Sequence, residues 1–566
     1  MPWSRCSTAA APWSIVAALC VSILLVNLQK KRGRRSMANI NHGRGLNAAV
    51  DVAAAALDMR APPENDQTFS LYENPEAEPT APPMELSESV LVLLKSFDVD
   101  PVRGFLPRID PLRRLPQAEL QPWETLAVAL PSLLAVGQAR KPIEALPELS
   151  VDVLTCHRER MRALLLLCVF AHASVWGNPE QPEDTIPKGV AVPLVALAGA
   201  EGLPPLLTHT SLVLHNWHRL DPSGPIRAEN LACNCRFLGG LDETWFYIAT
   251  VEIEARGGGV FGALLEAQRA IAEAASTLSS DDAAADANDG GNDASSARAA
   301  QVVGEALAVA RAGIVSMREA LARMPVGCHP LIFYKRVRPF LSGWKANPTL
   351  PNGIVYEGVS TKRQFYYGGS AAQSTLFPAL DAALGVSHSA HSSNAFLLDM
   401  RNYMPPGHRR LVEHLSDPAC PSIRCFIQNF PASSREEQRA CGKASRPGES
   451  GDNVSCVTAS PQGSPRNAGH ETDSSSRSGG GRPMVESSAA EGLREAYNGC
   501  LDALAAFRST HLSIVGSYIL QQQKKDQKAG EAKSREDFAG GKGTGGTPLL
   551  DFLKPLKNDS RAVLLK

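Results

Sequence analysis

The sequence of 566 residues lacks most of the patterns that assign a chain to a common functional class. It has no Cys-x-x-Cys pair, and its 12 cysteines are scattered along the chain. Cys233 and Cys235 lie two residues apart, but no matching Cys or His pair completes a zinc site around them. We therefore expect a reduced, intracellular compartment.

The sequence also has little excess of either charge. A net charge of −1 at pH 7, without a long basic face, argues against a nucleic-acid binder that works by neutralising many phosphates. No Gly-rich phosphate loop, HExxH motif or repeated βαβ spacing occurs. Residues 245–255 could form a strand by β-propensity, but they run into the helix-favouring "LLEAQRAIAEAA". We predict an all-α fold.

One long hydrophobic run is present, at residues 9–28, and it matches the thickness of a bilayer. Its positive charges follow it, at Lys30, Lys31, Arg32, Arg34 and Arg35. This order predicts a signal anchor with the rest of the chain in the cytosol, on the endoplasmic reticulum or the mitochondrial outer membrane. A cleaved organellar targeting peptide is the alternative.

Composition divides the rest of the chain. Residues 276–299 carry five aspartates and almost no bulky apolar residue, which predicts a disordered acidic insert. Residues 151–177 have the length and composition of a buried helix. The expected organisation is an anchor with its basic flank at 1–36, a disordered tether at 37–96, a small helical domain at 97–222, a catalytic domain in two parts at 223–430 and 492–566, and a disordered insert at 431–491.

One histidine lies within an apolar helical stripe. The stripe has alternating spacings of 4 and 3 residues and consists of Leu493, Tyr497, Cys500, Leu504, Phe507, His511, Ile514 and Tyr518. Such a histidine is usually a core residue. The alternative is a haem ligand, since haem needs a neutral imidazole in an apolar slot and cations for its propionates. Arg508 lies one helical turn before His511 and could be such a cation.

A second candidate segment is "LIFYKRVRPFLSGWKANP", residues 331–348. Dense cations are usually solvated. Phe333 and Tyr334 could nevertheless form an apolar wall beside Arg338, which would suit an aromatic amino acid with its carboxylate. The small residues of 366–374 suit a close backbone approach, and 543–547 ("GTGGT") alone indicates a flexible linker.

Five ordered blocks of the sequence resemble the indoleamine 2,3-dioxygenase family. They are "FLSGWKANPTLPNGIVYEG", "GGSAAQSTLFPALDAALGV", "FLLDMRNYMPPGHRRLVEHL", "GLREAYNGCLDALAAFRSTHLSIVGSYI" and "KGTGGTPLLDFLK". The resemblance covers residues 97–430, apart from the acidic insert, and 492–553. It implies an all-helical, two-domain haem dioxygenase, in which His511 is the proximal iron ligand, Arg508 contacts a propionate and Asp381 holds Arg508.

The resemblance also implies roles around the substrate. Arg338 would take the substrate carboxylate, and Phe333, with Tyr334 beside it, would pack on the indole. A gap-free alignment places Trp245 at a pocket aromatic and Ala249 where relatives often have Ser. Gly369, Ser370 and Ala371 would belong to a loop that lines the haem edge. Thr544 would belong to a flexible loop that closes over the bound substrate.

Two positions depart from the family pattern. His209 stands where a pocket Tyr is common, and Ala249 lacks a hydroxyl for the indole N–H or the bound oxygen. The predicted activity is insertion of both atoms of O2 across the indole C2–C3 bond of L-tryptophan, giving N-formylkynurenine, with haem b as cofactor, an electron donor to keep iron ferrous, and a monomeric protein without nucleic acid. An oxygen-binding haem protein and a dioxygenase for another indole are the alternatives.

Overall fold

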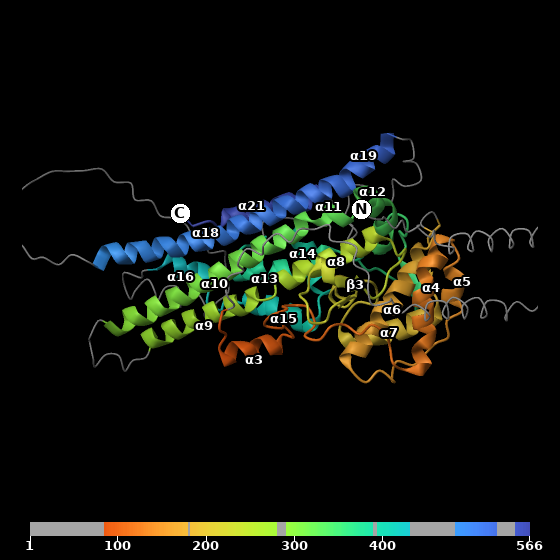
Figure 1. Ribbon diagram of the computed structural model, residues 1–566, viewed down its shortest axis with the longest axis horizontal. Coiled ribbons are helices and arrows are strands. Elements are labelled where there is room, and N and C mark those ends of the chain that lie inside the picture. The colour runs from red at the N-terminus through yellow and green to blue at the C-terminus, as the bar shows by residue number, and fades with distance from the viewer. Residues whose placement is uncertain are drawn as a thin grey trace, which may run out of the picture. The chain divides into compact units, whose positions relative to one another are not determined.

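The computed structural model describes residues 84–178, 181–279, 290–388, 393–430, 482–528 and 549–565, and these residues are mostly helical (Figure 1). This confirms the helical fold class. The predicted membrane segment at 9–28 and Thr544 lie outside the described residues. Anchoring, localisation and the role of Thr544 therefore stay predictions.

Helices of four residues or more account for most of the described chain. They are α3 (Glu88–Ser96), α4 (Gln121–Ala135), α5 (Arg140–Glu144), α6 (His157–Trp176), α7 (Lys188–Glu201), α8 (Leu241–Arg256), α9 (Val260–Ser279), α10 (Gly290–Ala322), α11 (Met324–Gly327), α13 (Leu376–Ala383), α14 (Ser393–Arg401), α15 (Pro406–Leu415), α16 (Ile423–Gln428), α18 (Arg482–Val515), α19 (Gln521–Lys528) and α21 (Leu549–Ala562).

Short turns and strands connect these helices. The short helical segments are η1 (Ala118–Leu120), η3 (Ala228–Asn230), α12 (Pro330–Ile332), η6 (Arg338–Leu341) and η7 (Ala371–Gln373). Strand β4 (Ile354–Tyr356) pairs in parallel with β1 (Thr185–Ile186) and antiparallel with β5 (Ser360–Gln364). A second pair is antiparallel, β2 (Trp217–Arg219) with β3 (Leu231–Cys233). The strands are too short to change the helical class of the fold.

Three segments have the wide turns of a π-helix. They are η2 (Thr210–Leu214), η5 (Phe333–Val337) and η8 (Gly516–Leu520). A π-turn inserts an extra residue into helical geometry and is frequent at functional sites. Each of the three contains or adjoins residues that the sequence marked as candidates, which directs attention to the region they share.

The long helices α9, α10 and α18 lie side by side, with α10 between the other two (Figure 1). Residues 294–327, which include most of α10, are the one stretch of the described chain that is long and apolar enough to cross a membrane. Its fully buried side chains include Val303, Leu307, Ala310, Ile314 and Met317. These side chains lie where α10 packs against α9 and α18.

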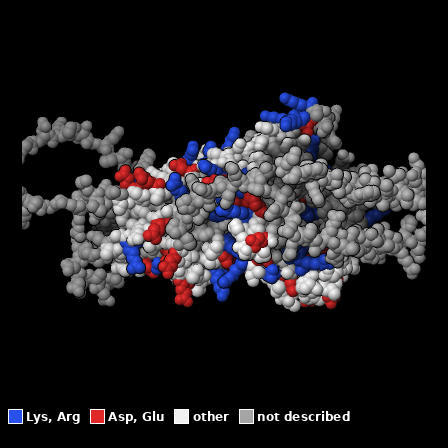
Figure 2. Space-filling view, viewed as in Figure 1, with Lys and Arg blue, Asp and Glu red and all other residues white. Residues whose placement is uncertain are grey.

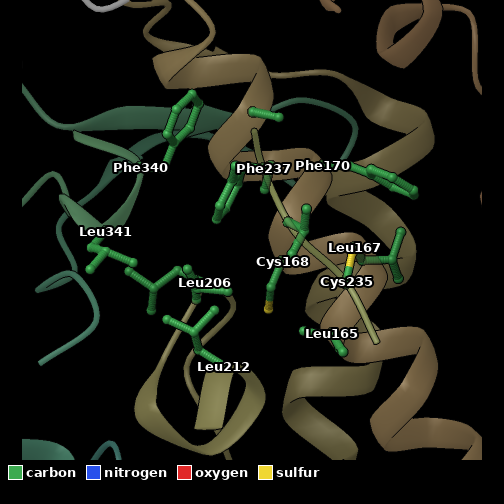
Figure 3. Close-up of a cluster of buried hydrophobic side chains, with 14 of the residues drawn as sticks. Leu165, Leu167, Cys168, Phe170, Leu206, Leu212, Cys235, Phe237, Phe340 and Leu341 are labelled. Carbon is green, nitrogen blue, oxygen red and sulfur yellow. The ribbon is translucent and has the colours of Figure 1, made fainter. Parts of the chain in front are cut away.

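Two large hydrophobic clusters make up most of the core of the described residues, and Figure 3 shows part of the first. The first is centred on α6, in which every residue from Met161 to Trp176 is buried, as the sequence predicted. The second joins α9, α10 and α18 with α3 and α13. Helix α8 contributes Tyr247 and Ala249 to the first cluster and Ile248 and Val251 to the second. The division into two domains at residue 222 stays a prediction.

The expected insert boundaries differ from those in the structure. Helix α9 continues to Ser279 and α10 begins at Gly290, so both ends of the 276–299 segment are helical. Helix α18 begins at Arg482, inside the expected 431–491 insert. In both cases a helix with a strong apolar stripe elsewhere extends into a polar sequence, because added turns cost little once a helix is nucleated.

A pair of glycines brings two chain segments into contact. A side chain at Gly368 would place its Cβ 2.2 Å from the carbonyl oxygen of Leu341 and 2.3 Å from the amide nitrogen of Gly343. The backbone amides of Trp344 and Lys345 both donate to the carbonyl of Tyr366, at 2.9 and 2.8 Å. The close approach expected for residues 366–374 is therefore made to the backbone that follows Arg338.

The visible surface carries both charges. Figure 2 shows Lys and Arg interspersed with Asp and Glu, with a small basic group at the end of α19. Lys524, Lys525 and Lys528 are exposed there. This mixed surface agrees with the near-zero net charge of the chain.

Candidate active site

His511 lies on α18, and its imidazole is half-buried. Burial, together with the nearby Arg508 cation, lowers the pKa of His511 to about 4, so the ring is neutral at pH 7. In the part of the chain that the structure describes, no group hydrogen-bonds to its ring nitrogens. The same residues contain no cluster of three or more His, Cys, Asp or Glu that could hold a metal. A neutral imidazole of this kind fits iron held by one protein ligand.

Arg508 is tied to α13 and α21 rather than open to solvent. Its Nη2 donates to both carboxylate oxygens of Asp381, at 2.7 and 2.6 Å. Its Nη1 donates to the carbonyl of Leu556, at 3.0 Å, and to Ser560 Oγ. Burial opposes ionisation of Asp381, but Arg508 and His388 hold its pKa below the ordinary value. The structure thus brings together Arg508 and Asp381, as the resemblance implies.

Arg338 lies at the end of the π-turn η5, and its side chain is buried. Its guanidinium lies 5.7 Å from the ring centroid of Tyr334. Burial lowers the pKa of Arg338, which still leaves it charged at pH 7. A buried cation beside aromatic rings suits a carboxylate ligand, because the carboxylate offsets the cost of burying the charge.

The segment after Arg338 is held by helix α6. Trp176 Nε1 donates to the carbonyl of Ser342, at 2.7 Å, and His172 contacts the carbonyl of Phe340 through Nδ1, at 2.8 Å. Phe340 stacks on Phe237 with ring centroids 4.7 Å apart, as Figure 3 shows. These contacts fix the backbone that carries Arg338, and none of them was visible in the sequence.

An aromatic row runs from α8 through η5 to η8. The ring centroid of Phe333 lies 4.6 Å from that of Phe246 and 5.7 Å from that of Tyr518. The hydroxyl of Tyr518 donates to the carbonyl of Cys328. The row joins the helix of His511 to the segment of Arg338, and Tyr518 continues the stripe on which His511 lies.

Trp245 is not part of this row, and its place at the substrate pocket stays a prediction. Its Nε1 donates to the carbonyl of Arg323 at 3.1 Å, and the Arg323 guanidinium lies 5.7 Å from its ring centroid. Gly327 packs against the same ring. The structure therefore places Phe246, and not Trp245, against Phe333. Neighbouring residues on a helix point about 100° apart, so Trp245 and Phe246 face different partners.

Ala249 is buried in the same hydrophobic cluster as Phe333 and Tyr334. It lies about one helical turn after Phe246. The adjacent Thr250 donates its hydroxyl to the carbonyl of Phe246, at 2.8 Å. That hydroxyl is thus used within the helix and does not replace the one missing at Ala249.

The loop that contains Gly369, Ser370 and Ala371 is capped by Ser370 and Gln373, which form a capping box at η7. Gln373 Oε1 accepts from the backbone amide of His209, at 3.0 Å, and its Nε2 donates to the carbonyl of Gly368, at 2.9 Å. The loop is thereby fixed to the start of η2.

His209 is buried and faces a carboxylate. Its Nε2 lies 2.8 Å from Glu254 Oε1, which also accepts from Ser374 Oγ at 2.6 Å. The residue that replaces the expected pocket Tyr thus makes a buried polar contact with α8. Sequence reasoning could not identify Glu254, since it lies 45 residues away from His209.

Comparisons with known proteins identify the family of the chain. A family model described as indoleamine 2,3-dioxygenase matches residues 93–444 and 475–563. The chain is 31% identical over 489 residues to indoleamine 2,3-dioxygenase 2 of Mus musculus, covering 86% of this chain and 99% of that protein. It is 30% identical over 477 residues to indoleamine 2,3-dioxygenase 1 of Rattus norvegicus, covering 84% and 96%.

A 6-hydroxytryptophan 2,3-dioxygenase of Fusarium equiseti is 29% identical over 485 residues, covering 83% of this chain and 98% of that protein. All three relatives are dioxygenases by name and match over most of their length. The extent of the family match and the identity over nearly whole relatives lead to one conclusion: the chain belongs to the indoleamine 2,3-dioxygenase family and is a dioxygenase.

Proposed function

We propose that this enzyme uses a haem b held by His511 to insert both atoms of O2 across the indole C2–C3 bond of L-tryptophan, giving N-formylkynurenine. The observation that carries the proposal is the neutral, half-buried imidazole of His511, which no described residue engages by hydrogen bonding. Such an imidazole offers a nitrogen lone pair to iron. When bound, haem supplies the iron at which dioxygen is activated.

The substrate carboxylate would bind Arg338. Its guanidinium is buried beside Tyr334, where a carboxylate gains a strong charge-assisted hydrogen bond. His172 and Trp176 fix the backbone after Arg338, so the guanidinium is positioned before substrate arrives. Positioning of this kind lowers the entropic cost of reaching the reactive geometry.

The indole ring would pack along the aromatic row. Phe246, Phe333 and Tyr518 present ring edges and faces to each other at 4.6 and 5.7 Å, an arrangement that an additional aromatic ring can extend. Ala249 supplies no polar group there, and the hydroxyl of Thr250 is used within α8. We therefore assign substrate binding to the Arg338 cation and to apolar packing along this row.

The test is turnover by the full chain reconstituted with haem. The iron is reduced, L-tryptophan and oxygen are added, and N-formylkynurenine is followed with time. We expect product with wild-type protein and loss of both product and the haem spectrum in His511→Ala. His218→Ala, which changes a half-buried histidine of β2, is the matched control and retains both.

Two other outcomes would redirect the assignment. A stable oxygenated haem spectrum without product would indicate an oxygen-binding protein and contradict the proposal. Turnover of 6-hydroxytryptophan but not of L-tryptophan would keep the reaction type and change the substrate, in line with the name of the Fusarium equiseti relative.

A further inference from the structure

A chain of four charged side chains connects the helix of His511 to the C-terminal helix. Arg508 on α18 binds Asp381 on α13. Asp381 Oδ2 also lies 3.0 Å from His388 Nε2, and His388 Nδ1 lies 2.7 Å from Asp559 Oδ2 on α21. Each of the four side chains is 16% exposed or less. These four side chains are therefore poorly hydrated, and each buried charge needs an opposite charge beside it.

The contacts of His388 fix its protonation state. An ionised carboxylate can only accept hydrogen bonds, and both ring nitrogens of His388 face a carboxylate oxygen. Both nitrogens must then carry a hydrogen, which makes the ring an imidazolium. With His388 charged, two cations and two anions alternate along these four side chains.

The geometry of Arg508 explains why a second donor matters. Only Nη2 of Arg508 reaches Asp381, and it is shared between both carboxylate oxygens. The pair thus lacks the two parallel bonds that fix an Arg–carboxylate pair when both guanidinium nitrogens take part. The other nitrogen, Nη1, binds α21 at Leu556 and Ser560. Asp381 therefore depends on His388 for its remaining restraint.

We propose that His388, as an imidazolium shared between Asp381 and Asp559, is a positioning residue for the reaction: it fixes the orientation of Arg508 beside His511 and fastens α21 to the same site. The proposal rests on the assignment of His511 as iron ligand in the proposed function. His388 touches neither substrate nor His511 in this role, and it acts through Asp381 and Arg508.

The charge at His388 gives the proposal a pH signature. Burial opposes protonation, but Asp381 and Asp559 raise the pKa of His388 above the ordinary value, despite the opposing Arg508 cation. A raised pKa in the folded state means that the stabilisation is complete below about pH 6.5 and is lost as pH rises through the folded pKa. The charged groups that face His388 are Asp381 from α13, Asp559 from α21 and Arg508 from α18.

The experiment compares haem-loaded, full-length wild type with His388→Gln, Asp559→Asn and the double variant from pH 5.5 to 9. The control is His218→Gln, which removes a half-buried histidine bonded to Asn234. The first readout is the melting temperature at each pH. We expect His388→Gln to melt about 2–4 °C below wild type near pH 6, the gap to close by pH 9, and the two single changes to be less than additive.

The second readout is the split of kcat and KM for L-tryptophan near pH 6. His388→Gln should lower kcat about fivefold and leave KM within about twofold, because substrate is bound elsewhere, by Arg338. A melting-temperature gap that is the same at every pH, or additive single effects, would overturn the imidazolium bridge. An unchanged kcat in a variant with the expected pH signature would overturn the positioning role.

The two readouts also separate this proposal from the proposed function. Absence of turnover in wild type would contradict the proposed function alone, since the pH dependence of the melting temperature would still report the His388 bridge. If His388→Gln does not fold at pH 6, Asp559→Asn alone carries the test. This change keeps an acceptor for His388 Nδ1 and removes only the negative charge.

Discussion

His172 hydrogen-bonds through Nδ1 to the carbonyl of Phe340, two residues after Arg338, at 2.8 Å. Its Nε2 accepts from the backbone amide of Leu207, two residues before His209, at 3.1 Å. The ring must therefore carry its hydrogen on Nδ1 and keep Nε2 free to accept. One neutral histidine of α6 thereby joins the segment after Arg338 to the segment before η2.

This relationship predicts a loss of stability in acid. Burial lowers the pKa of His172 to about 4. A histidine whose folded pKa is depressed destabilises the fold as pH falls from 6.5 towards 4, since the unfolded chain takes up the proton first. The depressed pKa corresponds to at most about 3–4 kcal/mol of unfolding free energy, lost in full only below about pH 4.

His172→Asn tests this, because the amide keeps a donor near Nδ1 and cannot be protonated. Unfolding of both proteins is followed at pH 7 and at pH 4.5. The variant should be less stable at pH 7 and should lose less stability in acid than wild type. The other buried histidines are present in both proteins. An equal loss of unfolding free energy between pH 7 and pH 4.5 in the two proteins would therefore contradict the role of His172.

Arg338→Gln should raise KM for L-tryptophan about tenfold to a hundredfold, because a charge-assisted bond to the carboxylate is replaced by a neutral one. The KM for tryptamine, which has no carboxylate, should be the same in wild type and Arg338→Gln. The neighbouring Arg336→Gln is the matched control, since Arg336 is exposed. Steady-state kinetics with both substrates checks the assignment, and an unchanged KM in Arg338→Gln would refute it.

Phe246→Leu and Trp245→Leu should have different effects although the residues are adjacent. Phe246 packs on Phe333, so its replacement should lower kcat/KM about fivefold. This factor corresponds to the loss of one aromatic pair worth about 1 kcal/mol. Trp245 packs on Arg323 and Gly327, so its replacement should lower the melting temperature and leave kcat/KM within about twofold. The reverse result would restore Trp245 to the substrate site.

Gly368→Ala should destabilise the protein by about 1–3 kcal/mol, because its Cβ would lie 2.2 Å from the carbonyl oxygen of Leu341 and neither backbone can yield freely. Gly516→Ala is the control, since no atom lies within 4 Å of its added Cβ. Thermal unfolding distinguishes the two. Equal melting temperatures would show that the two backbones separate without cost.

The helix of His511 could be predicted because its signal is local. Spacings of 3 and 4 residues record the turn of one helix, and α18 with η8 buries Leu493, Tyr497, Leu504 and Tyr518 as expected. The pairing of Arg508 with Asp381 also followed, but only from the resemblance to a family. Without it, a separation of 127 residues carries no signal.

Other features could not be predicted, for physical reasons. Helix α8 is buried on several faces, so its hydropathy does not show that Phe246 is the aromatic residue that faces Phe333. The contacts of His172 are made to backbone atoms, which leave no trace in side-chain pattern. The link from His388 to Asp559 spans 171 residues and depends on how α21 docks.

The π-turn η5 has a consequence for spacing along the chain. The amide of Arg338 donates to the carbonyl of Phe333, five residues earlier, so the two residues lie one above the other along the turn. In an α-helix the same separation would rotate Arg338 about 140° away from Phe333. If this segment became a regular α-helix with the same five-residue separation, the guanidinium would point to a different side of the protein. The count of residues in this segment is therefore as much a part of the substrate site as their identities.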